Sequence, residues 1–187
     1  MLIILEGVDC SGKTWMAERL LKQIPNTIIM KHGTKPKSAD PKQQMTLKST
    51  YEHMYDMAVL SEAQGFNVIF DRYFLSELVY APIKRDYDPK IEYVPGEYYW
   101  ELEEKILQLS HLLVYVYADI DIIKSRLESR GDDYIVDQDL PLLQQGYDLL
   151  VSKTRLCQMT IASSDLSIDV ILNYIDYLNV IANTRTT

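Results

Sequence analysis

Gly7-Val8-Asp9-Cys10-Ser11-Gly12-Lys13-Thr14 matches the phosphate-binding pattern G-x-x-x-x-G-K-[S/T] at every defined position. An apolar run at residues 1–5 precedes this stretch and predicts a buried strand, and residues 12–24 predict a helix that ends at Pro25. A strand, a glycine-containing loop and a helix N-terminus form the arrangement in which backbone N–H groups converge on phosphate oxygens. The stretch therefore predicts a site for a nucleoside triphosphate or a similar polyphosphate.

Two side chains of this loop have chemistry that suits a bound nucleotide. We expect Lys13 to reach the outer phosphates and the hydroxyl of Thr14 to bind Mg²⁺. The alternative is a chance match in an ordinary strand-to-helix turn. The apolar run before the loop and the helical pattern after it weigh against that alternative.

The rest of the chain alternates short apolar runs with longer segments of helical periodicity. The runs are continuously apolar, which is typical of strands that are covered on both faces. The alternation predicts an α/β fold with a parallel five-stranded sheet wrapped by helices, and ligands at the carboxyl ends of the strands. The expected strands are 1–5, 27–30, 67–70, 112–117 and 159–162; the expected helices are 12–24, about 43–64, 74–81, 97–109, 120–130, 139–157 and 166–182.

Length and charge limit the classes of partner. The 187 residues fit one domain, residues 1–187, with a sizeable core. The formal net charge of −8 argues against nucleic acid and anionic membranes as partners, because a broad basic face would need large compensation elsewhere. Small-molecule nucleotides remain suitable ligands, because they need only a local cluster of Lys and Arg.

The cysteines and the first residues point to a cytoplasmic protein. Cys10 and Cys157 lie far apart without metal-binding spacing, which indicates a reducing compartment. The three histidines are scattered, and we expect structural or surface roles for them. The apolar start is five residues long and runs directly into the loop, so we do not expect it to be a signal peptide or a membrane span.

A second group of polar residues, Asp71-Arg72-Tyr73, follows the third expected strand. A carboxylate at a strand end beside a phosphate loop is well placed to hold Mg²⁺, and the adjacent Arg72 can clamp a phosphate. Alternatively, Asp71 caps the next helix and Arg72 points into solvent. The presence of the phosphate loop favours the functional interpretation.

A third group is the pair Arg126 and Arg130, which lie four residues apart in an expected helix and so share one face. Gly131 and an acidic stretch follow. This pattern predicts a mobile lid, at about residues 126–140, that brings positive charge over a transferring phosphoryl group. A solvated basic face paired with Glu128 is the alternative.

With these groups in order, the chain resembles the thymidylate kinase family of P-loop nucleoside monophosphate kinases. The resemblance spans nearly the whole length and rests on four segments taken together. They are ILEGVDCSGKT, DRYFLSELVY, RLESRGDD and TIASSDLSIDVILNYI.

The resemblance implies a role for each matched residue. The loop with Lys13 would hold the phosphates of ATP, Asp9 would bind the 3′-hydroxyl of the acceptor deoxynucleotide, and Arg72 would grip a phosphate. Asp71 would orient the Mg²⁺ shell, and a homodimer is implied as the assembly. The implied catalytic residues are Lys13, Arg72, Arg126 and Arg130; the implied nucleotide-binding residues are Gly7, Asp9, Cys10, Ser11, Gly12, Lys13, Thr14, Ser76, Tyr80, Ala162 and Ser163; the implied metal ligands are Thr14 and Asp71.

The chain also departs from the family pattern. The residue after Asp133 is Tyr134, where the family lid usually has an arginine. The R-x-P motif that clamps the acceptor appears only as Thr34-Lys35-Pro36. These departures concern the base pocket and the lid more than the phosphate machinery.

The expected activity is ATP- and Mg²⁺-dependent phosphoryl transfer to a deoxynucleoside monophosphate, either dTMP or a related pyrimidine deoxynucleotide that includes 5-modified forms. Two alternatives stay open. A deoxynucleoside kinase would phosphorylate a 5′-hydroxyl, but it needs a carboxylate at the end of the second strand, where this chain has Met30-Lys31-His32-Gly33. A nucleotide-binding module without turnover is the other alternative.

Overall fold

The computed structural model of the chain describes all residues except 32–40, 85–95, 132–134, 165–166 and 185–187. These described residues form five strands and seven helices, with one or two helices after each strand. The strands are β1 (Leu2–Glu6), β2 (Thr27–Lys31), β3 (Asn67–Asp71), β4 (His111–Tyr117) and β5 (Gln158–Ala162). The helices are α1 (Lys13–Gln23), α2 (Pro41–Ala63), α3 (Phe74–Lys84), α4 (Gly96–Ile106), α5 (Ile120–Arg130), α6 (Asp139–Lys153) and α7 (Asp169–Thr184).

The five strands form one parallel sheet in the order β2-β3-β1-β4-β5. β1 therefore lies at the centre, between β3 and β4. In this register Leu5 of β1 pairs with Asp71 of β3, and Lys31 of β2 pairs with the same Asp71. The carboxyl ends of β1, β2 and β3 consequently lie side by side at the same edge of the sheet. The predicted fold class is confirmed.

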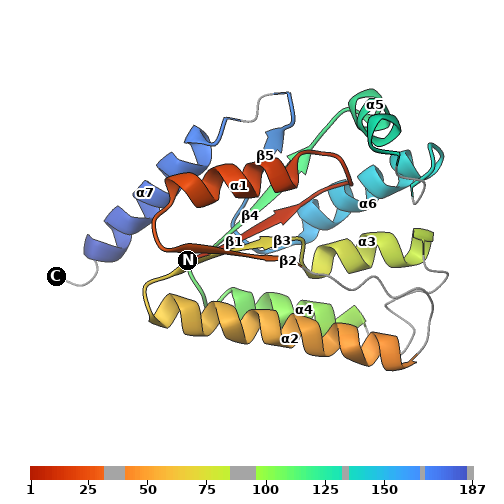
Figure 1. Cartoon of the computed structure of the whole chain (residues 1–187). Coiled ribbons are helices and arrows are strands. Elements are labelled where there is room, and N and C mark those ends of the chain that lie inside the picture. Colours follow the sequence, from red (N-terminus) through yellow and green to blue (C-terminus); the bar gives the residue numbers. More distant parts are fainter. Residues whose placement is uncertain (32–40, 85–95, 132–134, 165–166, 185–187) are drawn as a thin grey trace.

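Helices cover both faces of the sheet (Figure 1). Alternate residues of β1 enter different cores: Leu2 and Ile4 pack in the larger one, and Ile3 and Leu5 in the smaller one. The smaller core contains residues of α1 and α7, whereas the larger core contains residues of α2, α3, α4 and α6. Because both faces are buried, the strands need apolar residues at every position, which explains the continuous runs.

Several helix ends differ from the sequence-based predictions; α4, for example, ends at Ile106 rather than at 109. α3 continues past Pro82 to Lys84, whose Nζ lies 2.6 Å from a carboxylate oxygen of Asp139 in α6, and this ion pair helps to hold the last turn. α6 ends at Lys153 rather than at 157, because Thr154 adopts an extended conformation and donates its hydroxyl to Glu103. α7 begins at Asp169 rather than at 166.

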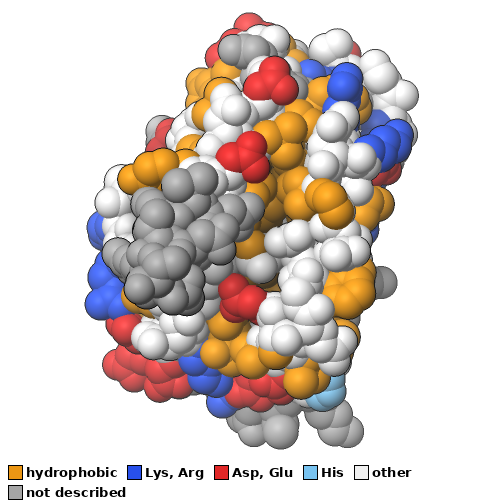
Figure 2. Space-filling model, turned by 90° about the vertical axis from the view of Figure 1, so that its left-hand side faces the viewer, with side chains coloured by type: hydrophobic (Ala, Val, Ile, Leu, Met, Phe, Trp, Pro, Cys, Tyr) orange, Lys and Arg blue, Asp and Glu red, His pale blue; other side chains and the backbone are white. Residues whose placement is uncertain are grey.

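The two ends of the sheet present different surfaces. Figure 2 shows the side that is at the left in Figure 1, away from the carboxyl ends of the strands, where hydrophobic side chains form a band with Lys and Arg mainly at its margins. Within the described residues, no helix combines the length and the apolar character needed to cross a membrane. The cationic side chains discussed below gather at the opposite end of the sheet.

Candidate functional site

The loop after β1 is shaped by positive φ angles. Gly7 has φ +145°, and a Cβ built there would lie 2.4 Å from the carbonyl oxygen of Val116, so no larger residue fits. Gly12 has φ +107° and immediately precedes α1. Cys10, between them, has φ +62°, which is uncommon outside glycine and is found where surrounding structure enforces it. The loop thus opens toward the N-terminus of α1, where backbone N–H groups favour anions.

Lys13 is turned into this loop. Its Nζ donates to the carbonyl oxygens of Gly7 at 2.9 Å and Val8 at 2.7 Å. Burial, together with repulsion by Arg72, lowers the pKa of Lys13 to about 7. The ammonium therefore occupies the concave side of the loop, within reach of any phosphate that the loop binds.

Thr14 and Asp71 face each other across the loop. The Thr14 hydroxyl donates to Oδ2 of Asp71 at 2.9 Å, and this oxygen lies 3.5 Å from Nζ of Lys31. A hydroxyl and a carboxylate beside a phosphate site are oxygen ligands of the kind Mg²⁺ takes together with substrate phosphates and water. The two residues therefore fit a magnesium ion, and the interpretation of Asp71 as a helix cap is not needed.

Arg72 is held in place by hydrogen bonds from both ends of its guanidinium. It has φ +75°, another strained position for a non-glycine residue. Nη1 donates to the carbonyl of Gly7 at 2.8 Å and to the hydroxyl of Tyr147 at 2.7 Å, and Nη2 forms an ion pair with Asp9 at 2.5 Å. The ring of Tyr80 lies under the guanidinium at 5.0 Å. The side chain of Arg72 therefore points into the site rather than into solvent.

Glu6, the last residue of β1, is a fully buried carboxylate below Arg72 that the sequence analysis did not identify. It accepts a hydrogen bond from the N–H of Tyr73 at 2.8 Å and one from the hydroxyl of Ser76 at 2.5 Å. Burial raises the pKa of Glu6, an effect partly opposed by the bond from Ser76 and by the charge of Arg72. Its place directly before the loop, as the one acidic residue in β1, was the available signal.

Tyr147 of α6 was also not identified. Its hydroxyl lies 2.8 Å from Oγ of Ser76 and 3.4 Å from a carboxylate oxygen of Glu6. The preceding residue is Gly146, where a Cβ would meet Cγ1 of Val79 in α3 at 3.1 Å. A small residue at this point lets α6 approach α3 closely enough for Tyr147 to reach the cluster.

The two arginines of α5 turn back onto the loop. Nη1 of Arg126 donates to the carbonyl of Cys10 at 2.9 Å and to the hydroxyl of Ser163 at 2.7 Å. Nη1 of Arg130 lies 4.0 Å from Sγ of Cys10. Arg126 thereby joins the loop after β1 to the residue after β5, so the alternative of a purely solvated basic face is excluded for it.

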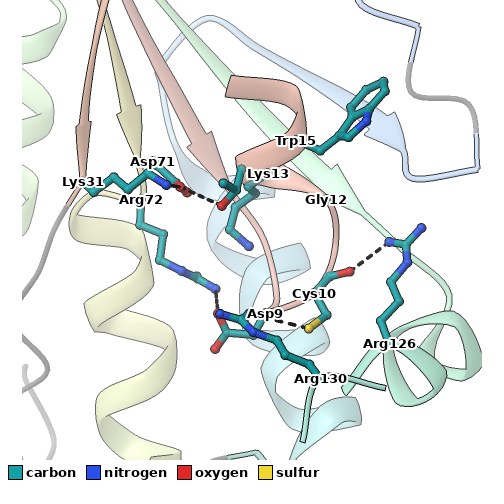
Figure 3. Close-up of a pocket in the computed structure, with 11 residues that line it drawn as sticks. Asp9, Cys10, Gly12, Lys13, Trp15, Lys31, Asp71, Arg72, Arg126 and Arg130 are labelled. Atoms are coloured by element: carbon teal, nitrogen blue, oxygen red, sulfur yellow. Dashed lines mark hydrogen bonds and ion pairs between the residues drawn. The ribbon is translucent and has the colours of Figure 1, made fainter. Parts of the chain in front are cut away.

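Eleven residues in and around this loop line one cavity of about 680 Å³ at the carboxyl ends of the strands (Figure 3). Five of its lining residues are cationic and two are acidic, which makes it locally positive in a chain of net charge −8. A polyanion is the ligand that this balance favours. The lining residues are Asp9, Cys10, Gly12, Lys13, Thr14, Trp15, Lys31, Asp71, Arg72, Arg126 and Arg130.

Some predicted site residues lie outside this lining. Ser76 and Tyr80 sit behind Arg72 and contact it, at 3.0 Å and 3.3 Å respectively. Gly7 and Ser11 shape the loop from beneath, and Ser11 is fully buried. Ala162 ends β5 with an exposed side chain. The segments Thr34-Lys35-Pro36 and Asp133-Tyr134 lie outside the described residues, as does the middle of the expected lid.

Lys31 and Trp15 line the cavity but were not predicted. From the sequence, Lys31 entered the argument only because the second strand ends without a carboxylate. Trp15 follows Thr14 directly, is 41% exposed, and has the guanidinium of Arg19 over its ring at 4.5 Å. The signal for both was their position: each lies at the carboxyl-end edge of the sheet or next to the phosphate loop.

Comparison with known proteins finds a relative that is similar over most of the chain. The SPbeta prophage-derived uncharacterized protein YorR of Bacillus subtilis is 33% identical over 156 residues, which are 83% of this chain and 84% of that protein. The crystal structure of YorR in complex with phosphorylated GDP superposes with a TM-score of 0.74 at 28% identity, over 98% of each chain. No protein-family model matches the chain.

More distant structures share the fold. Thymidylate kinase from Candida albicans has a TM-score of 0.65 at 19% identity, covering 95% of this chain and 91% of its own. Deoxyadenosine kinase from M. mycoides, solved with the products dCMP and a flexible dCDP bound, has a TM-score of 0.59 at 18% identity, covering 95% and 100%. The fold is therefore the one that thymidylate kinases and deoxynucleoside kinases have in common.

Proposed function

We propose that this chain, which belongs to the same protein family as YorR of Bacillus subtilis, transfers the γ-phosphoryl group of ATP to a deoxynucleoside monophosphate, dTMP or a related pyrimidine deoxynucleotide. The observation that carries the proposal is the cationic cavity built on an intact phosphate loop, with Lys13, Thr14 and Asp71 together at its centre. The resemblance to thymidylate kinases and the shared fold support the choice of a nucleotide as acceptor.

The donor phosphates would bind on the concave side of the loop, beside the ammonium of Lys13. Entry of a triphosphate offers the Lys13 ammonium phosphate oxygens in place of the two carbonyls that it contacts in the structure. Its positive charge would then stabilise the charge that spreads over the transferring group. Since the carbonyl bonds are released only when the phosphates arrive, the lysine is held close to its working position beforehand.

Thr14 and Asp71 are the residues that would hold Mg²⁺. When bound, the ion would neutralise negative charge on the donor phosphates. The protein itself contributes alignment of donor and acceptor. An acceptor monophosphate is already an anion, so no general base is required from the chain.

The acceptor side is formed by Asp9, Arg72 and Tyr80. Asp9 is positioned from two directions: its carboxylate pairs with Arg72, and its backbone N–H donates to the hydroxyl of Tyr80 at 3.0 Å. A carboxylate held in this way can accept a hydrogen bond from a sugar hydroxyl, the role that the family resemblance implies. Arg126 and Arg130, with the segment at about 126–140 as a lid, would complete the site over the phosphates.

A deoxynucleoside kinase is the second candidate, because the deoxyadenosine kinase fold matches almost the whole chain. Such an enzyme must remove a proton from a 5′-hydroxyl. β2 ends at Lys31, and the two carboxylates of the cavity are Asp9, which pairs with Arg72, and Asp71, which pairs with Lys31. This arrangement favours an acceptor that needs no base.

The decisive experiment is ADP release from Mg-ATP with a panel of acceptors. The panel is dTMP, dUMP, 5-hydroxymethyl-dUMP, dCMP, dGMP, dAMP, UMP and thymidine. We expect turnover with one or more of the deoxynucleoside monophosphates and none with thymidine. Turnover with thymidine alone would establish the nucleoside kinase instead. No turnover with any acceptor, combined with tight ATP binding, would indicate a binding module. The implied homodimer is checked on the same sample by light scattering.

A further inference from the structure

Lys31, the last residue of β2, is a cation at the cavity whose role the proposed reaction leaves open. In the sheet register it lies opposite Asp71. Its Nζ is 3.5 Å from Oδ2 of Asp71, the same oxygen that accepts the hydrogen bond of Thr14. The Lys31 side chain is 56% exposed, whereas that of Asp71 is 9% exposed. A flexible ammonium from the cavity rim thus pairs with a buried carboxylate at the proposed metal position.

This pairing cannot persist unchanged when a metal-bound donor is present. A divalent cation held by Thr14 and Asp71 would share one carboxylate oxygen with the ammonium, and like charges at that separation repel. Lys31 has a four-carbon stem and three N–H donors, so it can leave without disturbing β2. The displaced ammonium is then available to an anionic ligand within the cavity.

The contacts of the other described cations of the cavity do not assign any of them to the phosphate of the acceptor. Arg72 directs both terminal nitrogens at protein acceptors, among them Asp9 and Gly7. Lys13 serves the donor loop. Arg126 donates to the carbonyl of Cys10 on the side of Lys13 opposite Lys31, Asp71 and Arg72 (Figure 3). Arg130 reaches Sγ of Cys10 from the end of α5. Lys31 therefore lies on the side of the cavity that Arg72 and Asp9 assign to the acceptor.

We propose that Lys31 binds the 5′-phosphate of the acceptor nucleotide, and that it rests on Asp71 until Mg²⁺ and the donor displace it. This role deepens the proposed transfer to a monophosphate and presupposes it. It also gives a physical reason for the preference for nucleotides over nucleosides. A lysine at the end of β2 attracts a phosphate, but as a cation it cannot take the proton of a 5′-hydroxyl.

The first test separates acceptor binding from donor binding. The variants are Lys31→Met, Lys31→Arg and, as a matched control, Lys22→Met at an exposed position of α1. Losing a charge-assisted hydrogen bond to phosphate should raise the KM for the best monophosphate of the panel about 10- to 100-fold in Lys31→Met. The KM for ATP should not rise, because Lys31 does not serve the donor. Lys31→Arg should retain most of the affinity, and Lys22→Met should match the wild type.

An unchanged acceptor KM in Lys31→Met overturns the proposal. An equal rise in both KM values would also overturn it, since that result indicates a general distortion of the site. Thermal unfolding of the three variants checks that the fold is retained. If the wild type turns over no acceptor at all, the proposed function fails, and the phosphate-binding role of Lys31 fails with it.

The second test measures the metal and needs no turnover. Mn²⁺ binding in the presence of ADP is followed by electron paramagnetic resonance. Removal of a competing cation from Asp71 should tighten Mn²⁺ binding about two- to fivefold in Lys31→Met, the range expected for one exposed ion pair. Weaker or unchanged binding would show that Lys31 does not compete with the metal, and the resting position on Asp71 would be wrong.

Discussion

The hydroxyl of Tyr147 in α6 lies 2.7 Å from Nη1 of Arg72, although the two residues are 75 positions apart in the chain. The contact joins the second half of the protein to the residue that follows β3. Through Arg72 it reaches Asp9, and through Ser76 it reaches the buried Glu6. The part of the cavity that we propose for the acceptor thus depends on a tyrosine that does not line it.

Tyr147→Phe should weaken this arrangement without removing the ring that packs in the core. Loss of hydrogen bonds to Arg72 and Ser76 should lower the free energy of unfolding by about 1–2 kcal/mol, measured by urea denaturation. The KM for the acceptor should rise more than the KM for ATP. Tyr177→Phe, at a 60% exposed position of α7, is the control and should leave both quantities unchanged. Equal behaviour of the two variants would mean that the Tyr147 hydroxyl is dispensable.

Lys13→Ala should abolish turnover with every acceptor. The ammonium is the cation closest to the concave side of the loop, and its loss should reduce kcat by a factor of at least about 10²–10³. Circular dichroism checks that the variant retains the fold. Steady-state kinetics of this variant and of Lys22→Ala make the comparison. Residual activity near the wild-type level would remove Lys13 from the mechanism.

Arg130→Ala and Arg126→Ala should have different effects. Arg126 bonds to the carbonyl of Cys10 and to Ser163, so its loss should weaken ATP binding as well as kcat. Arg130 lies at the end of α5 with Nη1 4.0 Å from Sγ of Cys10, and as a lid residue its loss should lower kcat more than it lowers ATP binding. Binding of ATP by calorimetry and kcat by ADP release separate the two. The lid interpretation is wrong if Arg130→Ala changes neither quantity.

Glu6→Gln should change how stability depends on pH. Burial raises the pKa of Glu6 above its ordinary value of 4.5, so the folded protein holds this proton more tightly than the unfolded chain does. Wild-type stability should therefore fall relative to Glu6→Gln as pH rises from 4.5 through the raised pKa of the folded state. Urea denaturation across this range gives the difference at each pH. A constant offset between the two proteins would contradict the raised pKa, whereas an offset that varies in this direction supports it.

Trp15 should report nucleotide binding by its fluorescence. The indole is 41% exposed and lines the cavity next to Thr14, so ADP should change its emission. Trp100, in α4, does not line the cavity and is the internal reference. When the Trp15→Phe variant is titrated with ADP, most of the change in tryptophan fluorescence should be lost. A signal that persists in this variant would place the responding tryptophan elsewhere.

Local sequence patterns were enough for the fold class and for the position of the loop from Gly7 to Thr14. The loop from Gly7 to Thr14 is contiguous, and its chemistry depends on neighbours within a few residues, so its pattern predicts its position at the N-terminus of α1. The five strands and seven helices follow from apolar periodicity, because parallel strands buried on both faces leave a plain signal. Helix ends were less accurate, since contacts such as those of Lys84 and Thr154 come from distant residues.

What the sequence by itself determined is therefore the phosphate loop, the order of the elements and the edge of the sheet where they meet. The tertiary structure alone decided which side chains meet there. Glu6, Tyr147 and Lys31 belong to segments whose local patterns describe an ordinary strand or helix, and they contact Ser76, Arg72 and Asp71 only because strand order β2-β3-β1 and the close approach of α6 to α3 bring them together. Periodicity records which residues are buried, but it does not record which buried residues touch.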